Sequence, residues 1–590
     1  MQNQIAQGNH FKHKIMDTQT QTLMKEAKPT TRMTGCEAVV QSLINEGVEL
    51  IFGYPGGTIM PVYDALYDVK DKLHHVLVRH EQGAVHAAQG YARVTGRVGV
   101  AVVTSGPGAT NTITGIADAM IDSTPIVIIS GQVGSSLLGT DAFQETDVVG
   151  ISQPITKWNY QVKTVEEIPT AIARAFYIAR SGRPGPVLID ITKDAQFASL
   201  DYRYEPLHKI RSYTPYPKVD PQAIDDAANL INLAKKPMAL VGQGVILAQA
   251  EKELLAFLEK TGVPAAWTLL GLSVMPTDHP LNIGMLGMHG NYGPNVKTNE
   301  ADLIIAIGMR FDDRVTGNVK TYATNAKIIH LEIDPAEINK NVHADVAVLG
   351  DVKESLPMLT AKVTSNSHTQ WMEEFNACMR IEHERIIKNE LSPTKPGLTM
   401  GEVVRMVSDA YRNDAILVTD VGQHQMMAAR YFKFKKTRSV VTSGGLGTMG
   451  FGLPSAIGAK LGTDRPVCLF VGDGGLQMTI QELGTIHQTK VPVKIVLLNN
   501  NFLGMVRQWQ ELFFEKRYAS TELINPDFQL IAKGYHIESL KVTERSQLQA
   551  AIRTMVDHDG PFLLEVMVEK EGNVFPMVPA GASVSDIRLE

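Results

Sequence analysis

The sequence predicts an α/β protein with three doubly wound domains, each a parallel sheet covered by helices. The main observation is a repeated unit, in which a short apolar run leads into a glycine-rich loop and then a helical segment. The unit recurs within 31–195, 221–363 and 399–590. The intervals 196–220 and 364–398 lack it and are rich in proline or charge, so we expect linkers there. Residues 1–30 are polar, and we expect a disordered tail.

The composition excludes several classes of protein. The chain has 590 residues and 44% hydrophobic content, enough for more than one large core. Its net charge of −6 offers no basic surface for nucleic acid, and no apolar run is long enough to span a membrane. Cys36, Cys378 and Cys468 are scattered, which indicates a reducing compartment and no disulfide or zinc framework. We see no secretory signal, so we expect a cytoplasmic protein.

The first domain is predicted from apolar runs at residues 50–52, 76–79, 98–104 and 126–130. Glu81 follows the second run and precedes Gly83 and Ala84, so we expect it at a helix N-terminus facing the carboxyl edge of the sheet. Such a Glu can simply favour the helix dipole. The alternative is a buried carboxylate with a chemical task, whose pKa burial would raise.

The middle domain is predicted to be a Rossmann-like sheet, from apolar runs at 238–241, 301–307 and 327–332. The glycines of Gly242-Gln243-Gly244 are a weak nucleotide signal, because a turn alone would explain them. Glu332 and Asp334 end the last run, where acidic residues of dinucleotide-binding folds hold a ribose hydroxyl.

The third domain contains the most specific motif. The run 467–471 ends in Gly472-Asp473-Gly474, and the run 493–498 ends in three asparagines, 499–501. Residues 479–490 between them have helical composition, so the two strands should be parallel neighbours with both polar clusters at one edge. A lone Gly-Asp-Gly is more often an ordinary turn. With the asparagines it offers carboxylate and amide oxygens, which suit Mg²⁺ that is also bound by phosphates.

GDG followed after 24 residues by NN resembles the diphosphate and metal motif of thiamine diphosphate (ThDP) enzymes. The strings GYPGG, HEQGA and TSGPGATN extend the likeness. Over residues 33–590 the chain resembles the acetohydroxyacid synthase (acetolactate synthase) large-subunit family. It departs from the family pattern at Val133-Gly134 and Thr192, near the expected substrate entrance.

The resemblance implies roles in ThDP and Mg²⁺ binding. Glu81 would hydrogen-bond the aminopyrimidine ring and favour the imino tautomer that deprotonates the thiazolium carbon. Met449, which could otherwise be core filler, would wedge between the two rings and hold the cofactor bent. Gly447 is assigned to catalysis with them. The implied metal ligands are Asp473, Asn500 and the carbonyl of Phe502. The ThDP set is Glu81, Val421, Gly422, Gln423, His424, Gly447, Thr448, Met449, Asp473, Gly474, Gly475, Asn500, Asn501, Phe502, Leu503, Gly504 and Met505.

The resemblance also implies FAD in the middle domain, although the net reaction is not redox. The implied FAD contacts are Arg183, Gly242, Thr268, Leu269, Leu270, Gly287, Met288, His289, Gly290, Gly308, Met309, Arg310, Phe311, Asp312, Glu332, Ile333, Asp351, Val352, Gly444 and Gly445.

The implied substrate residues are Phe143, Gln144, Lys193, Arg314 and Trp509. A planar guanidinium such as that of Arg314 suits a carboxylate, although a surface salt bridge with Asp312 or Asp313 explains Arg314 equally well from the sequence alone. Trp509 could be core or an oligomer contact. In the family this position lines the second-substrate pocket and favours 2-ketobutyrate as acceptor.

The implied activity is decarboxylation of pyruvate and condensation of the two-carbon unit with pyruvate or 2-ketobutyrate, in valine, leucine and isoleucine biosynthesis. Because Glu81 and Asp473 lie in different domains, the family arrangement implies a site between two subunits of a homodimer or homotetramer. A separate regulatory small subunit is also expected.

Three alternatives remain at this point. A pyruvate oxidase-like oxidoreductase also carries ThDP and FAD, but Arg314 and Trp509 argue against it. A glyoxylate carboligase would lack the Glu at position 81. A non-catalytic nucleotide-binding or regulatory protein would have little reason to keep Glu81, Asp473 and Asn500 together.

Overall fold

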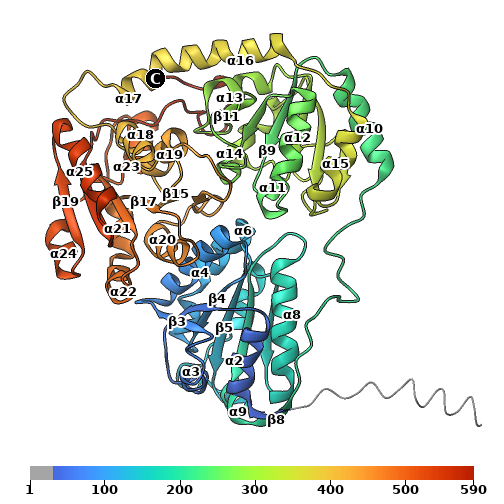
Figure 1. The fold of residues 1–590 in the computed structure, drawn as a ribbon, viewed down its shortest axis with the longest axis vertical. Helices are drawn as coiled ribbons and strands as arrows, with labels where there is room; N and C mark the ends of the chain where they lie inside the picture. Colours follow the sequence, from blue (N-terminus) through green and yellow to red (C-terminus); the bar gives the residue numbers. More distant parts are fainter. Residues whose placement is uncertain (1–30) are drawn as a thin grey trace, which may run out of the picture.

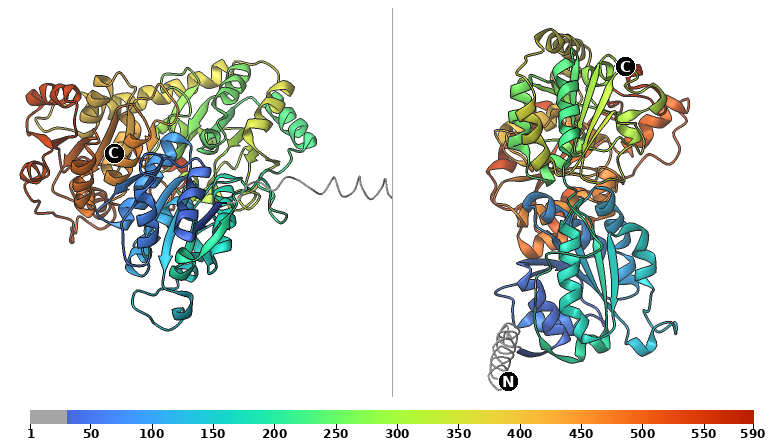
Figure 2. Two further views of the ribbon diagram at one scale, coloured as in Figure 1. Left: turned by 60° about the horizontal axis from the view of Figure 1, so that its bottom comes forward. Right: turned by 90° about the vertical axis from the view of Figure 1, so that its right-hand side faces the viewer.

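The fold is described from a computed structural model, over residues 31–590. Three six-stranded parallel sheets form three lobes, coloured blue to teal, green to yellow, and orange to red in Figure 1. In the right-hand view of Figure 2 the N-terminal lobe lies below the other two. The strands are buried along most of their length because helices cover both faces of each sheet. The predicted fold class is confirmed.

The N-terminal sheet has the strand order β3-β2-β4-β5-β7-β6. Its strands are β2 (Leu50–Gly53), β3 (His74–Leu77), β4 (Gly99–Val103), β5 (Ile126–Gln132), β6 (Trp158–Val162) and β7 (Val187–Thr192). The main helices are α2 (Gly35–Asn45), α3 (Met60–Tyr67), α4 (Glu81–Thr95), α6 (Ile113–Ile121) and α8 (Ile168–Arg180). The run expected at 76–79 lies two residues earlier as β3, because Val78 and Arg79 already lead into α4.

The middle sheet has the order β11-β10-β9-β12-β13-β14. Numbered in chain order this is 3-2-1-4-5-6, the order of dinucleotide-binding folds, as the Rossmann-like prediction requires. Its strands are β9 (Pro237–Val241), β10 (Ala265–Trp267), β11 (Asn282–Met285), β12 (Leu303–Ile307), β13 (Lys327–Glu332) and β14 (Val346–Leu349). Its main helices are α10 (Pro221–Leu233), α12 (Glu251–Thr261), α13 (Tyr292–Thr298) and α15 (Val352–Lys362).

The C-terminal sheet has the order β16-β15-β17-β18-β20-β19. Its strands are β15 (Ile416–Thr419), β16 (Val440–Val441), β17 (Val467–Gly472), β18 (Lys494–Asn499), β19 (Glu538–Val542) and β20 (Phe562–Met567). Its helices include α18 (Met400–Ala410), α19 (Gln423–Tyr431), α20 (Gly452–Leu461), α21 (Asp473–Met478), α22 (Leu483–Thr489), α23 (Gly504–Phe513), α24 (Phe528–Gly534) and α25 (Arg545–Asp557). β17 and β18 are parallel neighbours, so the predicted βαβ unit is confirmed.

The segments expected as linkers are more structured than their polarity suggested. β8 (Ser199–Tyr202) pairs antiparallel with β1 (Thr31–Thr34), and so belongs to the N-terminal lobe. α16 (Thr369–Glu382) lies along the top of Figure 1 and buries Trp371 and Phe375 against the middle lobe. A few buried side chains fix these segments to the lobes. The predominantly polar composition of the segments conceals these side chains in the sequence.

The chain end also crosses between lobes. After β20 it returns to the middle lobe, where the Val578 N–H donates to the Met288 carbonyl (2.8 Å) and Val584 is buried. The middle and C-terminal lobes share one hydrophobic cluster, in which Trp267 meets Phe434 edge to face. The last residues therefore strengthen the interface between the middle and C-terminal lobes. The predicted boundaries place all of 399–590 in the C-terminal domain and do not show this contact.

The N-terminal lobe meets the C-terminal lobe through α4 and α20 (Figure 1). A Cβ on Gly90 would lie 2.0 Å from the Ser455 carbonyl oxygen, and one on Gly458 would lie 1.8 Å from that of Ala87. Only glycine permits this backbone approach. Among the helices of residues 31–590, none combines the length and apolar character needed to cross a bilayer.

Candidate active site

The carboxyl edge of the C-terminal sheet brings Asp473, the predicted carboxylate ligand, together with neighbouring asparagines. Asp473 begins α21 directly after β17, and Asn499 ends the neighbouring β18. The Asn525 amide nitrogen lies 2.7 Å from Asp473 Oδ2, 3.1 Å from Asn499 Oδ1 and 3.0 Å from Asn501 Oδ1. Burial raises the pKa of Asp473, while hydrogen bonds from Asn525 and the backbone oppose the shift. Three side-chain oxygens thus surround one donor.

Asn525 is a site residue that no sequence signal marks. It lies 52 residues after Asp473, in an irregular segment without a glycine-rich motif. Nearby, Asn500 Oδ1 accepts the Phe502 N–H at 3.1 Å. Within residues 31–590 no group of three or more His, Cys, Asp or Glu could hold a metal ion. A cation here would therefore need amide and carbonyl oxygens and a bound phosphate, which is the Mg²⁺ pattern.

The glycine loops of this lobe pack against one histidine. A Cβ on Gly422 or on Gly472 would lie 2.9 Å from the His424 ring, so both loops approach it closely. Burial lowers the pKa of His424 to about 4, which keeps the imidazole neutral. Its Nε2 is buried without a hydrogen-bond partner. An orphaned nitrogen among glycine loops fits a diphosphate, because a ligand oxygen would satisfy it.

Met449 lies in the glycine-rich loop 443–450. Gly447 in this loop has φ +68°, a left-handed conformation that favours glycine. The Met449 methyl lies 3.8 Å from where a Cβ on Gly474 would be, next to the Asp473 motif. The Gly450 N–H donates to the Asp420 carboxylate at 3.0 Å. The loop therefore holds a large flexible side chain over the edge where the predicted ThDP residues converge.

A cavity of about 790 Å³ extends from Met449 into the middle lobe. It is lined by all the residues implied for FAD except Gly290 and Phe311. The Gly290 carbonyl instead accepts from Arg430 at 3.1 Å, and Phe311 packs in the core against His330. His289 Nδ1 and Trp509 Nε1 are buried without partners in residues that line the cavity. A large, partly apolar cavity with such polar atoms fits a dinucleotide.

The middle part of this cavity lies at the point where the strand order reverses. The Gly242 N–H donates to the Ile307 carbonyl (3.0 Å), and a Cβ on Gly244 would lie 2.7 Å from the Gly308 Cα. Glu332 ends β13, and burial raises its pKa to about 7. Arg183 reaches across from the N-terminal lobe to Glu337 (2.8 Å) and Asp334 (3.2 Å). The site has the position that ligands take in open α/β sheets.

The residues predicted to bind substrate fall into two groups. Arg314 and Trp509 line the cavity. The Arg314 Nε lies 3.6 Å from Asp313 Oδ2 and both side chains are mostly exposed, so this pair holds the guanidinium only weakly. Phe143, Gln144 and Lys193 do not line the cavity. Phe143 is 88% exposed, and Lys193 follows β7 at the carboxyl edge of the N-terminal sheet.

Glu81 belongs to the second group. It begins α4 as predicted, and its Oε2 accepts from the Asn111 amide at 2.9 Å. A Cβ on Gly108 would lie 3.4 Å from Glu81 Oε1, so the SGPGATN loop packs on the carboxylate. Glu81 is half-buried rather than buried, and it does not line the cavity with Met449. The two halves of the predicted site lie on separate edges of one chain.

Comparison with known proteins shows three domains of the thiamine pyrophosphate enzymes. The N-terminal TPP-binding domain matches residues 33–151, the central domain 224–359, and the C-terminal TPP-binding domain 420–566.

Curated relatives match almost the whole chain. The acetolactate synthase isozyme 2 large subunit of Escherichia coli is 47% identical, over 94% of this chain and 99% of its own length. The acetolactate synthase large subunit of Corynebacterium glutamicum is also 47% identical, over 94% and 90%. A probable acetolactate synthase large subunit of Methanococcus aeolicus is 44% identical, over 94% and 95%. The chain belongs to the acetolactate synthase large-subunit family of thiamine pyrophosphate enzymes.

Proposed function

We propose that this chain is a catalytic subunit that decarboxylates pyruvate and joins the two-carbon unit to a second 2-keto acid. With pyruvate or 2-ketobutyrate as acceptor, the products lead to valine, leucine and isoleucine. The observation that carries the proposal is that Met449, which lies next to the Asp473 motif, lines one cavity with Arg314 and Trp509. The family assignment supports it.

When bound, ThDP supplies the electron sink for decarboxylation of a 2-keto acid. Asp473, Asn500 and the Phe502 carbonyl would hold Mg²⁺, and the backbone at Gly422 and Gly474 would approach the diphosphate. His424 would donate or accept a hydrogen bond at its free Nε2, depending on its tautomer. Met449 would press on the cofactor from the side of the cavity and set its bent shape.

Glu81 would exchange a proton with the aminopyrimidine ring nitrogen. The Asn111 amide fixes the orientation of its carboxylate, and the half-exposed position leaves one edge open to a ligand. Because Glu81 does not share the cavity with Met449, the complete site would need the N-terminal edge of a second chain. A homodimer, or a homotetramer built from it, is therefore the proposed active form.

The substrate carboxylate would bind to Arg314, whose guanidinium is otherwise held only by an exposed pair. Trp509 would line the acceptor pocket and favour the longer 2-ketobutyrate. Phe143, Gln144 and Lys193 would close the same site from the partner's N-terminal edge. FAD would occupy the middle part of the cavity, where it would order the site without a net redox step.

Product analysis tests this function. The purified chain is incubated anaerobically with pyruvate, ThDP, Mg²⁺ and FAD, and acetolactate is measured. We expect acetolactate from the wild type and a loss of about 10²–10⁴-fold in Glu81→Gln, the range for a positioned acid–base group. Glu166→Gln, an exposed carboxylate of the same lobe, is the matched control. Acetate or acetyl phosphate with reduced flavin would instead indicate an oxidase.

A regulatory small subunit is also proposed, because several relatives are named as large subunits. Activity and its inhibition by valine are measured with and without a candidate small subunit. We expect both to change on its addition. Identical values in the two preparations would contradict this part of the proposal.

A further inference from the structure

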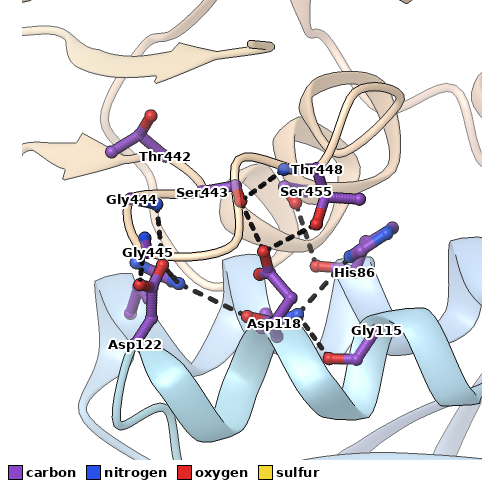
Figure 3. A network of polar contacts seen from close by, with 12 residues as sticks. His86, Gly115, Asp118, Asp122, Thr442, Ser443, Gly444, Gly445, Thr448 and Ser455 are labelled. Atoms are coloured by element: carbon purple, nitrogen blue, oxygen red, sulfur yellow. Dashed lines mark hydrogen bonds and ion pairs between the residues drawn. The ribbon is translucent and has the colours of Figure 1, made fainter. Parts of the chain in front are cut away.

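Two buried carboxylates of the N-terminal lobe hold the glycine-rich loop 443–450 of the C-terminal lobe. Asp118 lies on α6 and Asp122 ends it, and both are buried. Figure 3 shows α6 below the loop, with both carboxylates directed toward it. Neither aspartate is among the residues implied for ThDP, FAD or substrate binding. Asp122 lines the cavity, but the hydrogen bonds of both carboxylates go to the loop, and these contacts need an explanation of their own.

Asp118 closes the loop at its two ends. The Ser443 hydroxyl donates to Asp118 Oδ1, and the Thr448 hydroxyl donates to the same oxygen at 2.9 Å. The Thr448 N–H in turn donates to the Ser443 hydroxyl at 2.8 Å. Residues five positions apart are thus joined through one carboxylate oxygen (Figure 3).

Asp122 holds the middle of the loop by its backbone. Its two oxygens accept the N–H groups of Gly444 (2.8 Å) and Gly445 (2.7 Å). A Cβ on Gly445 would lie 3.0 Å from Asp122 Oδ1, so glycine lets the backbone come this close. Burial raises the pKa of Asp122, and the Arg93 guanidinium at 2.9 Å opposes this shift. The carboxylate is thus paired with a cation and two backbone donors.

Met449 lies between two anchored residues. Thr448, before it, is bound to Asp118 of the N-terminal lobe. Gly450, after it, is bound to Asp420 of its own lobe at 3.0 Å. The backbone on both sides of Met449 is therefore fixed, and the N-terminal lobe supplies one of the two anchors.

We propose that Asp118 and Asp122 are positioning residues that set Met449 against the cofactor. They act through the loop: Asp118 does not line the cavity, and Asp122 lines it with both carboxylate oxygens engaged by the loop backbone. Because the loop also lines the cavity through Gly444 and Gly445, the same contacts fix its wall. Without them the loop keeps its hydrogen bond to Asp420 of its own lobe, but the backbone before Met449 is no longer held. The catalytic consequence rests on the proposed function, whereas the loop's dependence on the two aspartates does not.

Amide hydrogen exchange of the cofactor-free protein, followed by mass spectrometry, tests the loop directly. In Asp118→Ala we expect the amides of 443–450 to exchange at least about tenfold faster, since local opening governs exchange. Asp118→Asn should restore most of the protection, because its Oδ1 still accepts both hydroxyls. The matched control is Thr442→Val, which removes a buried hydroxyl next to the loop that does not contact α6.

Kinetics on the same variants test the consequence for Met449. With ThDP saturating, we expect Asp118→Ala to lower kcat by about 10–100-fold, since small misplacements near reacting groups have large effects. We expect KM for pyruvate to change by less than about threefold, because substrate groups are left in place. If Asp118→Ala does not fold, Ser443→Ala removes the shared hydroxyl and must give the same pattern.

Three outcomes would overturn the inference. One is loop exchange in Asp118→Ala no faster than in Thr442→Val. Another is exchange in Asp118→Ala that is accelerated throughout α4 and α6 as much as in 443–450, which would mean that the variant loosens the whole lobe and not the loop. The third is unchanged kcat with a mobile loop. A wild type that makes no acetolactate would refute the proposed function, and the exchange experiment would still decide whether the aspartates hold the loop.

Discussion

The N-terminal and C-terminal sheets share one topology and carry different chemistry. With strands numbered in chain order, both have the order 2-1-3-4-6-5, whereas the middle sheet has 3-2-1-4-5-6. In each of the two like sheets, the loop after the third strand lies where the strand order reverses. That loop holds Asn111 and orients Glu81 in one sheet, and it begins with Asp473 in the other. One backbone frame thus presents the Glu81 carboxylate in one lobe and the Asp473 carboxylate in the other, and the proposed function gives them proton exchange and cation binding.

Under the proposed function, neither sheet forms an active site alone. The N-terminal edge has a half-exposed carboxylate but none of the glycine loops packed around His424. The C-terminal edge has those loops and the ring of side-chain oxygens around Asn525. The proposed function assigns each edge to a different end of one cofactor.

The largest expected effect comes from mixing two inactive variants, Glu81→Gln and Asp473→Asn. If the site forms between chains, random mixed dimers contain one intact site, and refolding the variants together should restore about a quarter of wild-type activity. The measurement is acetolactate formation before and after co-refolding. Activity that stays at the level of the separate variants would place both residues in the same site of one chain.

The second prediction concerns the buried ion pair of the N-terminal lobe that faces the C-terminal lobe. Arg93 and Asp122 form a pair at 2.9 Å with side chains 5% and 0% exposed. Arg93→Gln would leave a buried carboxylate without its cation, and should lower the free energy of unfolding by about 3–5 kcal/mol. Arg97→Gln breaks an exposed pair with Glu49 and should lower it by less than about 1 kcal/mol. Urea unfolding of both variants gives the comparison, and equal values would contradict it.

The third prediction separates the roles of the two edges. Asp473→Asn removes the single carboxylate of the oxygen cluster, so the Mg²⁺ concentration needed for half-maximal ThDP binding should rise about 100-fold. Glu81→Gln should leave this concentration nearly unchanged. Calorimetric titration with ThDP at several Mg²⁺ concentrations measures both. The control is Asp464→Asn, which alters an exposed turn of the same lobe.

The smallest effect is expected in the middle sheet, which carries neither Glu81 nor Asp473. Burial raises the folded-state pKa of Glu332 from 4.5 to about 7. The folded protein then holds this proton more tightly than the unfolded chain, so the free energy of unfolding falls as pH rises from about 4.5 to about 7. Glu332→Gln should remove about 2 kcal/mol of this fall. Unfolding at pH 5 and pH 8 measures it, and Glu354→Gln, an exposed carboxylate, should keep the wild-type slope.

Much of the fold could be predicted because its signals are local. Buried parallel strands are continuous apolar runs, and glycine-rich loops follow them, as at 467–475 and 98–111. Three parallel sheets, and the pairing of β17 with β18, agree with the prediction. The strand β8 and the helix α16 could not be predicted as parts of lobes, because their partners lie far away in the chain.

The candidate site could be predicted only where its residues sit inside a motif. Asp473 and Glu81 each follow a strand, so their positions at sheet edges agree with the expectation. Asn525 follows no strand, and Asp118 has the sequence surroundings of any amphipathic helix. Asn525 meets partners 24 to 52 residues away and Asp118 meets partners 325 or more residues away, and only the folded chain brings them together.

The sequence by itself determined the three-sheet architecture and the family, and it predicted which polar side chains stand at each sheet edge. These follow from hydrophobic periodicity and from glycines, carboxylates and amides at fixed places after strands. The tertiary structure alone decided which loop each edge contacts. Asp118 and Asp122 hold the loop around Met449 because α6 packs against another lobe, and hydrogen bonds across such a distance leave no periodic trace in the sequence.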